Sequence, residues 1–206
     1  MSAVYAETHI RALQVAKECV DMGARVKTVS RITGLAIPML RSLFYQDTVS
    51  PPGRWLESAD WYHRSNMVER AEASLFAVIF DTLLVSHRCK PAEALVSAYR
   101  LYLERCSTSP CLPFERAFNL ACEMHGIWDS REPQLALHTC RRCRSRYVVA
   151  IGDLSADHSG CVFCKLLKRY PRDSYMQAHF AACTIPVLAA ANHGTFEHQE
   201  TGPKIA

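Results

Sequence analysis

The segment 140–164, CRRCRSRYVVAIGDLSADHSGCVFC, carries two Cys-x-x-Cys pairs on either side of an apolar run. The pairs are Cys140 with Cys143 and Cys161 with Cys164, and 17 residues separate them. A Cys-x-x-Cys turn lets two thiolates face one ion, and two such turns complete a tetrahedron of sulfur ligands. This spacing is typical of a structural zinc site. We therefore predict one structural Zn²⁺ per chain, held by these four cysteines.

The run RYVVAI at residues 146–151 favours a β-strand, and Gly152–Asp153 can turn the chain after it. The sequence thus predicts a small zinc-ribbon-like module over residues 131–183. Four cysteine ligands leave no coordination position for water or substrate, so the site is predicted to be structural and the protein not to be an enzyme.

Two other interpretations of the cysteines remain open. Cys161 and Cys164 could instead form a finger with His179 and Cys183, which follow at a suitable distance. That set would leave Cys140 and Cys143 unused, whereas the four-cysteine set uses every paired cysteine. A redox Cys-x-x-Cys is disfavoured because no βαβ pattern precedes either pair.

Positive charge is concentrated around the cysteines. Residues 138–172 contain eight basic and two acidic residues, a net charge of +6 within a chain whose total is +4. Clustered cations on a rigid module indicate contact with nucleic-acid phosphates, although a solvated surface gives a similar pattern. The candidate DNA-binding residues of this module are Arg141, Arg142, Arg144, Arg146, Lys165, Lys168 and Arg169.

The rest of the chain has a mainly α pattern, so we expect a helical domain over residues 1–130. Helices are predicted at residues 5–22, 25–33, 36–46, 60–86, 91–106 and 113–126, with a connector at 47–59. Pro91 and Pro113 open two of these helices. Asp60 is a possible N-cap of the long one. Residues 184–206 offer little to bury and are predicted to be a disordered tail.

Residues 24–46, ARVKTVSRITGLAIPMLRSLFYQ, fit a helix-turn-helix pattern. Val29 and Ile32 would pack inward and Gly34 would turn the chain. The second helix would be seated by Leu35, Ile37, Leu40 and Leu43. That helix has few polar residues that could read bases, and Arg41 is its main cationic candidate. The segment could contact DNA or serve as a packing hairpin.

Composition excludes several classes. With 49% hydrophobic and 21% charged residues, the chain is an ordinary globular protein. No apolar run reaches the ~18 residues of a membrane span. The N-terminus lacks a secretion signal pattern, so a cytoplasmic location is expected and the ten cysteines are expected to be reduced.

Several blocks together resemble the FlhC family of bacterial flagellar transcriptional activators. They are GAR at 23–25, SPP at 50–52, SADWY at 58–62, ASLF at 73–76, AYRLYLE at 98–104 and the paired cysteines. The resemblance spans roughly residues 8–170. After SPP the chain continues as GRWLES, where the family usually has a Lys-Gly-containing, Leu-Pro stretch, which suits a divergent member or paralogue.

The resemblance implies a mostly helical subunit with a four-cysteine zinc site. It implies assembly of four FlhD and two FlhC chains into a hetero-hexamer that binds DNA upstream of flagellar promoters and recruits RNA polymerase. We therefore expect a DNA-binding activator subunit. The alternative is a zinc-stapled protein-interaction module in which the basic residues meet an acidic partner and make no direct DNA contact.

Overall fold

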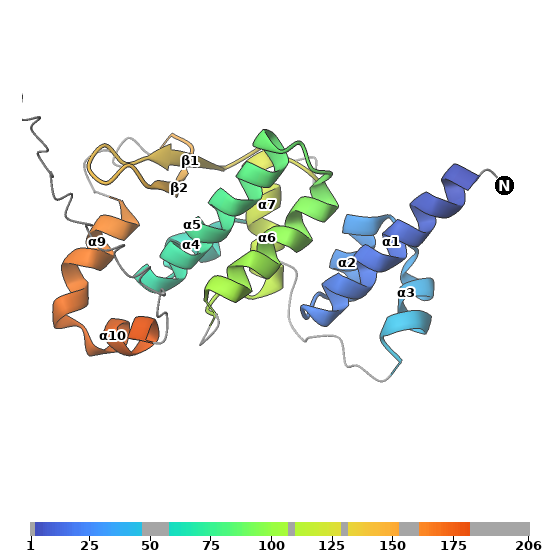
Figure 1. The fold of residues 1–206 in the computed structure, drawn as a ribbon, viewed down its shortest axis with the longest axis horizontal. Helices are drawn as coiled ribbons and strands as arrows, with labels where there is room; N and C mark the ends of the chain where they lie inside the picture. The colour runs from blue at the N-terminus through green and yellow to red at the C-terminus, as the bar shows by residue number, and fades with distance from the viewer. Residues whose placement is uncertain (1–2, 47–57, 107–109, 129–131, 153–160, 182–206) are drawn as a thin grey trace, which may run out of the picture.

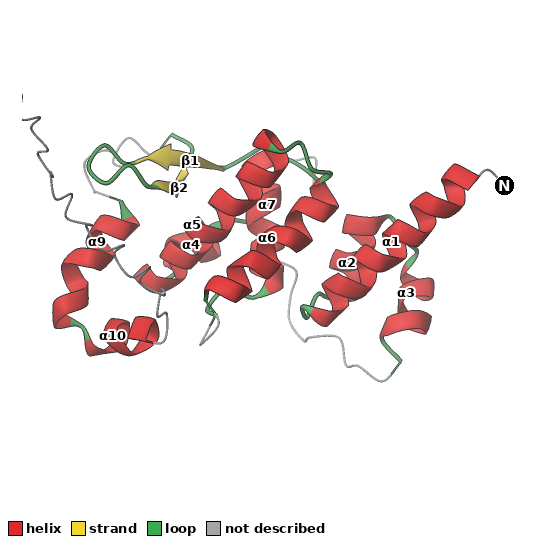
Figure 2. Ribbon diagram, viewed as in Figure 1, coloured by secondary structure: helices red, strands yellow, loops and turns green. Residues whose placement is uncertain are grey.

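The computed structural model describes residues 3–46, 58–106, 110–128, 132–152 and 161–181. Helices dominate this part of the chain, with one two-stranded sheet, as Figure 2 shows. The elements are α1 (Ala3–Asp21), α2 (Val26–Thr33), α3 (Ile37–Phe44), α4 (Asp60–Arg64), α5 (Met67–Asp81), the π-helical turn η1 (Thr82–Ser86), α6 (Pro91–Arg105), α7 (Phe114–His125), β1 (Leu135–Thr139), β2 (Arg146–Ala150), α9 (Val162–Arg169), the 3-10 turn η2 (Tyr170–Arg172) and α10 (Ser174–Ala181). The predicted mainly α fold is confirmed.

The first three helices form one end of the molecule (Figure 1). Gly34 ends α2 in the left-handed conformation, at φ 74°, and α3 begins three residues later. Leu40 is fully buried, as expected from the helix-turn-helix pattern, but Leu43 is 54% exposed. The prediction for Leu43 was wrong because Phe44 packs against the core in its place, one turn after Leu40.

Glu115 of α7 fastens this end to the rest of the protein. Its two carboxylate oxygens accept hydrogen bonds from the Arg25 amide at 2.8 Å and the Thr28 hydroxyl at 2.9 Å. The carboxylate therefore satisfies donors at the start of α2, where helices leave amide groups unpaired. Helix α1 also packs on α6, so the N-terminal helices share a core with the central ones.

Helix α5 is the centre of the fold. It contacts α6, α7, β2 and α9, and its residues Ala73, Phe76, Ala77 and Phe80 are buried in the core. The single helix expected over residues 60–86 is wrong at both ends. Asn66 starts α5 as its N-cap after the extended residue Ser65, and residues 82–86 form a π-helical turn. Ala59, rather than Asp60, is the residue that precedes α4 as its N-cap.

The Asn66 cap offers a test of this break. Its side chain accepts a hydrogen bond from the Glu69 amide at 3.0 Å. Asn66→Ala is expected to lower the free energy of unfolding by about 1 kcal/mol, because one helix donor loses its partner. Denaturant unfolding measures the change. Asn66→Asp keeps an acceptor and should stay near wild type, and an equal loss in both variants would argue against capping.

The C-terminal part is built on a hairpin and two short helices. Strands β1 and β2 pair antiparallel with Leu135 opposite Ala150 and Thr139 opposite Arg146. Leu135 and Val148 are buried in the same core as the helices. The Tyr62 hydroxyl donates to the Val148 carbonyl at 2.7 Å and the Ser74 hydroxyl accepts from the Val148 amide at 3.2 Å. The hairpin is thus fixed to α4 and α5, which determines where the paired cysteines lie.

Across the described ranges, no helix has the length and apolar character needed to cross a membrane.

Candidate metal centre

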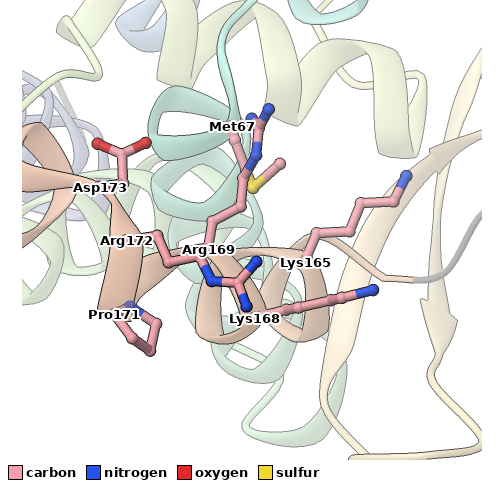
Figure 3. Close-up of a pocket in the computed structure, with 7 residues that line it drawn as sticks. All are labelled: Met67, Lys165, Lys168, Arg169, Pro171, Arg172 and Asp173. Carbon is pink, nitrogen blue, oxygen red and sulfur yellow. The ribbon is translucent and has the colours of Figure 1, made fainter.

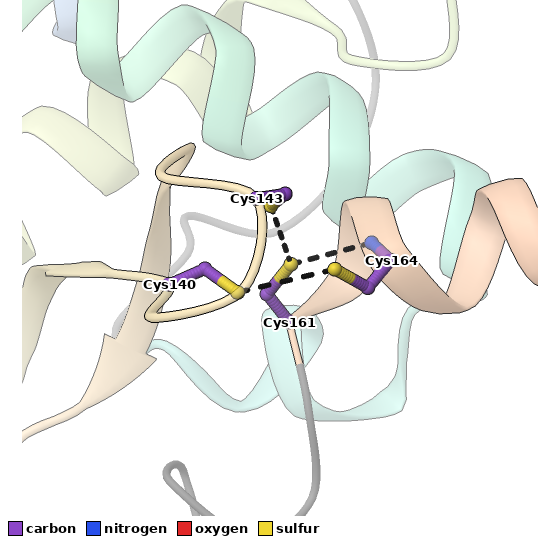
Figure 4. Close-up of side chains that lie close together, drawn as sticks. All are labelled: Cys140, Cys143, Cys161 and Cys164. Carbon is purple, nitrogen blue, oxygen red and sulfur yellow. Dashed lines mark hydrogen bonds between the residues drawn. The ribbon is translucent and has the colours of Figure 1, made fainter.

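The four paired cysteines converge at one point beside the start of α5. Cys140 and Cys143 lie in the loop that joins β1 to β2, and Cys161 and Cys164 lie at the start of α9 (Figure 4). Their sulfur atoms all lie within 4.8 Å of one another. Met67 and Ala71 of α5 pack against the cluster. Segments that are distant in sequence therefore present four thiols to one volume.

The sulfur separations suit a tetrahedral metal ion. The Cys140 and Cys164 sulfurs are 3.9 Å apart, and those of Cys143 and Cys161 are 3.4 Å apart. Zinc–sulfur bonds of about 2.3 Å at tetrahedral angles place the sulfurs about 3.8 Å apart. Disulfide sulfurs would be only about 2.05 Å apart. The cluster could thus hold a metal ion, as the sequence spacing predicts, and a closed set of four thiolates would serve it as a structural site.

Backbone hydrogen bonds shape both halves of the site. In the loop, the Cys140 amide donates to the Ser145 carbonyl and the Arg144 amide donates to the Cys140 carbonyl, each at 2.9 Å. At α9, the Cys161 sulfur caps the helix by accepting from the Cys164 amide at 3.2 Å. A helix N-terminus favours negative charge, so the thiolate form of Cys161 gains stability there.

The two pairs differ in their acidity. Hydrogen bonds from Ser145 lower the pKa of Cys143 to about 6, and the Cys143 amide lowers that of Cys140. Burial raises the pKa of Cys161 to about 12. The neighbouring Cys161 side chain lowers the pKa of Cys164, but Cys143 and burial outweigh it, so the balance is upward. A bound cation would therefore have to displace the proton of Cys161.

Arg144 holds the left-handed conformation that glycine adopts most easily, with φ 63°. Arg144→Gly should relieve this strain and raise the free energy of unfolding by roughly 0.5–1 kcal/mol, measured on metal-loaded protein. Arg142→Gly, two residues earlier at an ordinary φ, should give no such gain. Equal changes in the free energy of unfolding for the two variants would contradict the proposed backbone strain at Arg144.

A second group of cations lies along α9 and η2, on the same module. Lys165, Lys168, Arg169 and Arg172 follow the i, i+3, i+4, i+7 spacing of one helix face, and all four are exposed. Together with Met67, Pro171 and Asp173 they line a hollow of about 990 Å³. Figure 3 shows the amines of Lys165 and Lys168 pointing the same way, with Asp173 at the opposite end. We call these four residues the α9 cations.

Among the described residues, no hydrogen bond or ion pair engages the side chains of the α9 cations. Arg172 was not among the predicted DNA-binding residues, although the helical spacing that reveals it is readable in the sequence. The α9 cations thus offer exposed positive charge around a concave surface, which suits an extended anion.

The other predicted DNA-binding residues are spread out. Arg141, Arg142 and Arg144 are exposed in the cysteine loop. The Arg146 guanidinium pairs with the Asp81 carboxylate at 2.5 Å, so part of its charge is neutralised. Arg41 is exposed on α3, at the opposite end of the molecule from α9 (Figure 1). The structure therefore brings Arg41 into neither basic group.

The alternative finger of Cys161, Cys164, His179 and Cys183 gains no support from the geometry. The His179 ring lies against the Glu72 carboxylate on α5, with Nε2 and Oε1 2.7 Å apart. Cys183 lies outside the described residues, as does the predicted tail at 184–206. The loop cysteines, which that finger would leave unused, belong to the four-sulfur cluster.

Comparisons with known proteins show the family of this chain. The family model "Flagellar transcriptional activator (FlhC)" matches residues 2–176. Flagellar transcriptional regulator FlhC of Pectobacterium carotovorum is 29% identical over 66% of this chain and 69% of its own length. The protein of the same name from Variovorax paradoxus is 27% identical over 76% of this chain and 75% of its own length. That of Proteus mirabilis is 25% identical over 85% and 90%. The relatives are named as transcriptional regulators and not as enzymes, and this chain belongs to the FlhC family of flagellar transcriptional activators.

Proposed function

We propose that this chain is a DNA-binding subunit of a flagellar transcriptional activator. In this account it acts with FlhD in a hetero-hexamer of four FlhD and two FlhC chains. The complex binds upstream of flagellar promoters and recruits RNA polymerase. The observation that carries the proposal is the set of exposed α9 cations around a hollow, on a helix that begins at the four-cysteine cluster.

The ion at the four-cysteine cluster is proposed to be Zn²⁺, and its role is structural. A cation there would tie the start of α9 to the loop between β1 and β2, and so set the direction of the α9 cations relative to Arg142 and Arg144. Each cation that contacts a phosphate releases a condensed counterion, which favours binding. A rigid module holds several cations in positions from which they can contact phosphates together. Flexible side chains on a mobile helix would lose more conformational entropy on binding.

The N-terminal helices expose several large apolar side chains. Val4, Tyr5 and Ile10 of α1 and Met39 and Leu43 of α3 are large hydrophobic residues that are 39–71% exposed. Apolar surface of this kind favours a protein partner. We assign partner binding to this end and DNA binding to the α9 end, which lie at opposite ends of the molecule in Figure 1.

A mobility-shift experiment with flagellar promoter DNA, with and without FlhD, tests the proposal. We expect a shift at low salt, strongest with FlhD present, and a steep loss of binding as salt rises. Absence of a shift in both conditions would contradict DNA binding. If the chain still assembled with FlhD, the alternative of a zinc-stapled interaction module would be supported instead.

A further inference from the structure

A second polar cluster is buried between α5, α10 and the segment before α7. Its centre is Glu72, whose side chain is only 2% exposed. One carboxylate oxygen accepts from the Tyr102 hydroxyl at 2.5 Å and from the Cys111 amide at 2.7 Å. The other lies 2.7 Å from Nε2 of His179, whose side chain is 8% exposed. Three separate parts of the chain thus meet at one buried carboxylate.

The cluster has the chemistry of a metal site. Ligand atoms of Glu72, Cys111 and His179 all lie within 4.8 Å of one another. Zinc bonds to oxygen, nitrogen and sulfur run from about 2.0 to 2.3 Å, which sets ligand separations of roughly 3.3–3.7 Å. The 2.7 Å between the Glu72 oxygen and the His179 nitrogen would have to open slightly. Carboxylate, imidazole and thiolate are all accepted zinc ligands.

Charge balance also favours a divalent cation here. A thiol must lose its proton to bind a metal ion, so a cation in this cluster would displace the proton of Cys111. A divalent ion that displaced this proton and met neutral imidazole would be balanced by two negative ligands. A charge-neutral complex avoids the high cost of an uncompensated buried ion.

We propose that Glu72, Cys111 and His179 form a second zinc site, separate from the four-cysteine cluster. With three protein ligands it would bind zinc more weakly than the closed cluster does. The ion would clamp α10 to α5. Because α10 follows η2 and packs against it, the clamp would also steady the C-terminal side of the hollow lined by the α9 cations.

Metal content of the purified full-length chain tests this proposal. After equilibration with about 1 μM free Zn²⁺ we expect about two zinc ions per chain. Cys111→Ser and His179→Gln should each lower the content to about one ion and leave the four-cysteine site loaded. Cys89→Ser, a half-buried cysteine outside both clusters, is the matched control and should retain about two.

Two results would overturn the proposal. One is a wild-type chain that saturates at a single zinc ion under these conditions. The other is unchanged stoichiometry in both Cys111→Ser and His179→Gln. Circular dichroism identifies a variant that has lost its fold, and two variants on different elements keep the test decisive if one of them unfolds.

Discussion

Replacing Cys140 with serine is expected to remove the ion from the four-cysteine cluster and to unfold the loop and helices around it. A serine hydroxyl is a poor zinc ligand, so the ion would lose one of its four protein bonds and the closed tetrahedral site would be broken. Binding free energy of a structural zinc ion is folding free energy, so the local loss is about 5 kcal/mol or more.

The loss of folded structure in Cys140→Ser should be confined to the segments around the four-cysteine cluster. The segment 140–145 and helix α9 carry the four cysteines, whereas Leu135 and Val148 belong to the main core and α5 packs against α6 and α7. Hydrogen exchange should therefore quicken at 140–145 and 161–169 and stay slow in α5, α6 and α7. Cys89→Ser is the control that removes a thiol outside the cluster. Unchanged zinc content in Cys140→Ser would refute the four-cysteine assignment.

Reversing charge on α9 is expected to abolish most DNA binding without disturbing assembly. Each phosphate contact contributes about tenfold to affinity at 0.1 M salt, so Lys165→Glu with Arg169→Glu should weaken binding by about 100-fold or more. The slope of log affinity against log salt should fall by about two. Fluorescence anisotropy with labelled promoter DNA at several salt concentrations measures both quantities.

The control for this pair is Arg88→Glu with Lys90→Glu, in the exposed loop between η1 and α6. It changes net charge by the same amount, so any difference in DNA affinity reports where the charges lie. Native mass of the complex with FlhD should be unchanged in both double variants. Loss of assembly in the α9 variant would favour a protein partner for these cations, and equal weakening by both pairs would leave α9 with no special role.

Local signals in the sequence predicted the features that depend on local chemistry. Pro91 opens α6 as expected, and Pro113 immediately precedes α7 as its N-cap. The Cys-x-x-Cys spacing grouped the four cysteines that the structure brings together. These features depend on backbone geometry and ligand spacing within short segments, so they can be read from the sequence alone.

The sequence did not predict features that depend on competing local interactions or on contacts between residues distant in the chain. Asn66 interrupts the expected long helix because its side chain caps α5, an outcome that periodicity alone does not signal. The Cys-x-x-Cys pattern predicts a turn at Cys161 and gives no sign of helix α9, whereas in the structure Cys161 is the N-cap of that helix. Glu72 and His179 are 107 residues apart in sequence, so their contact could only come from the folded chain.

The most direct test of the central claim is the zinc dependence of promoter binding by the assembled complex with FlhD. Affinity for flagellar promoter DNA would be measured with zinc present, after its removal by a chelator, and after zinc is restored. We predict that binding is lost with the metal and returns with it, because the metal fixes the cations that meet the DNA. Undiminished binding by the zinc-free complex would contradict the account.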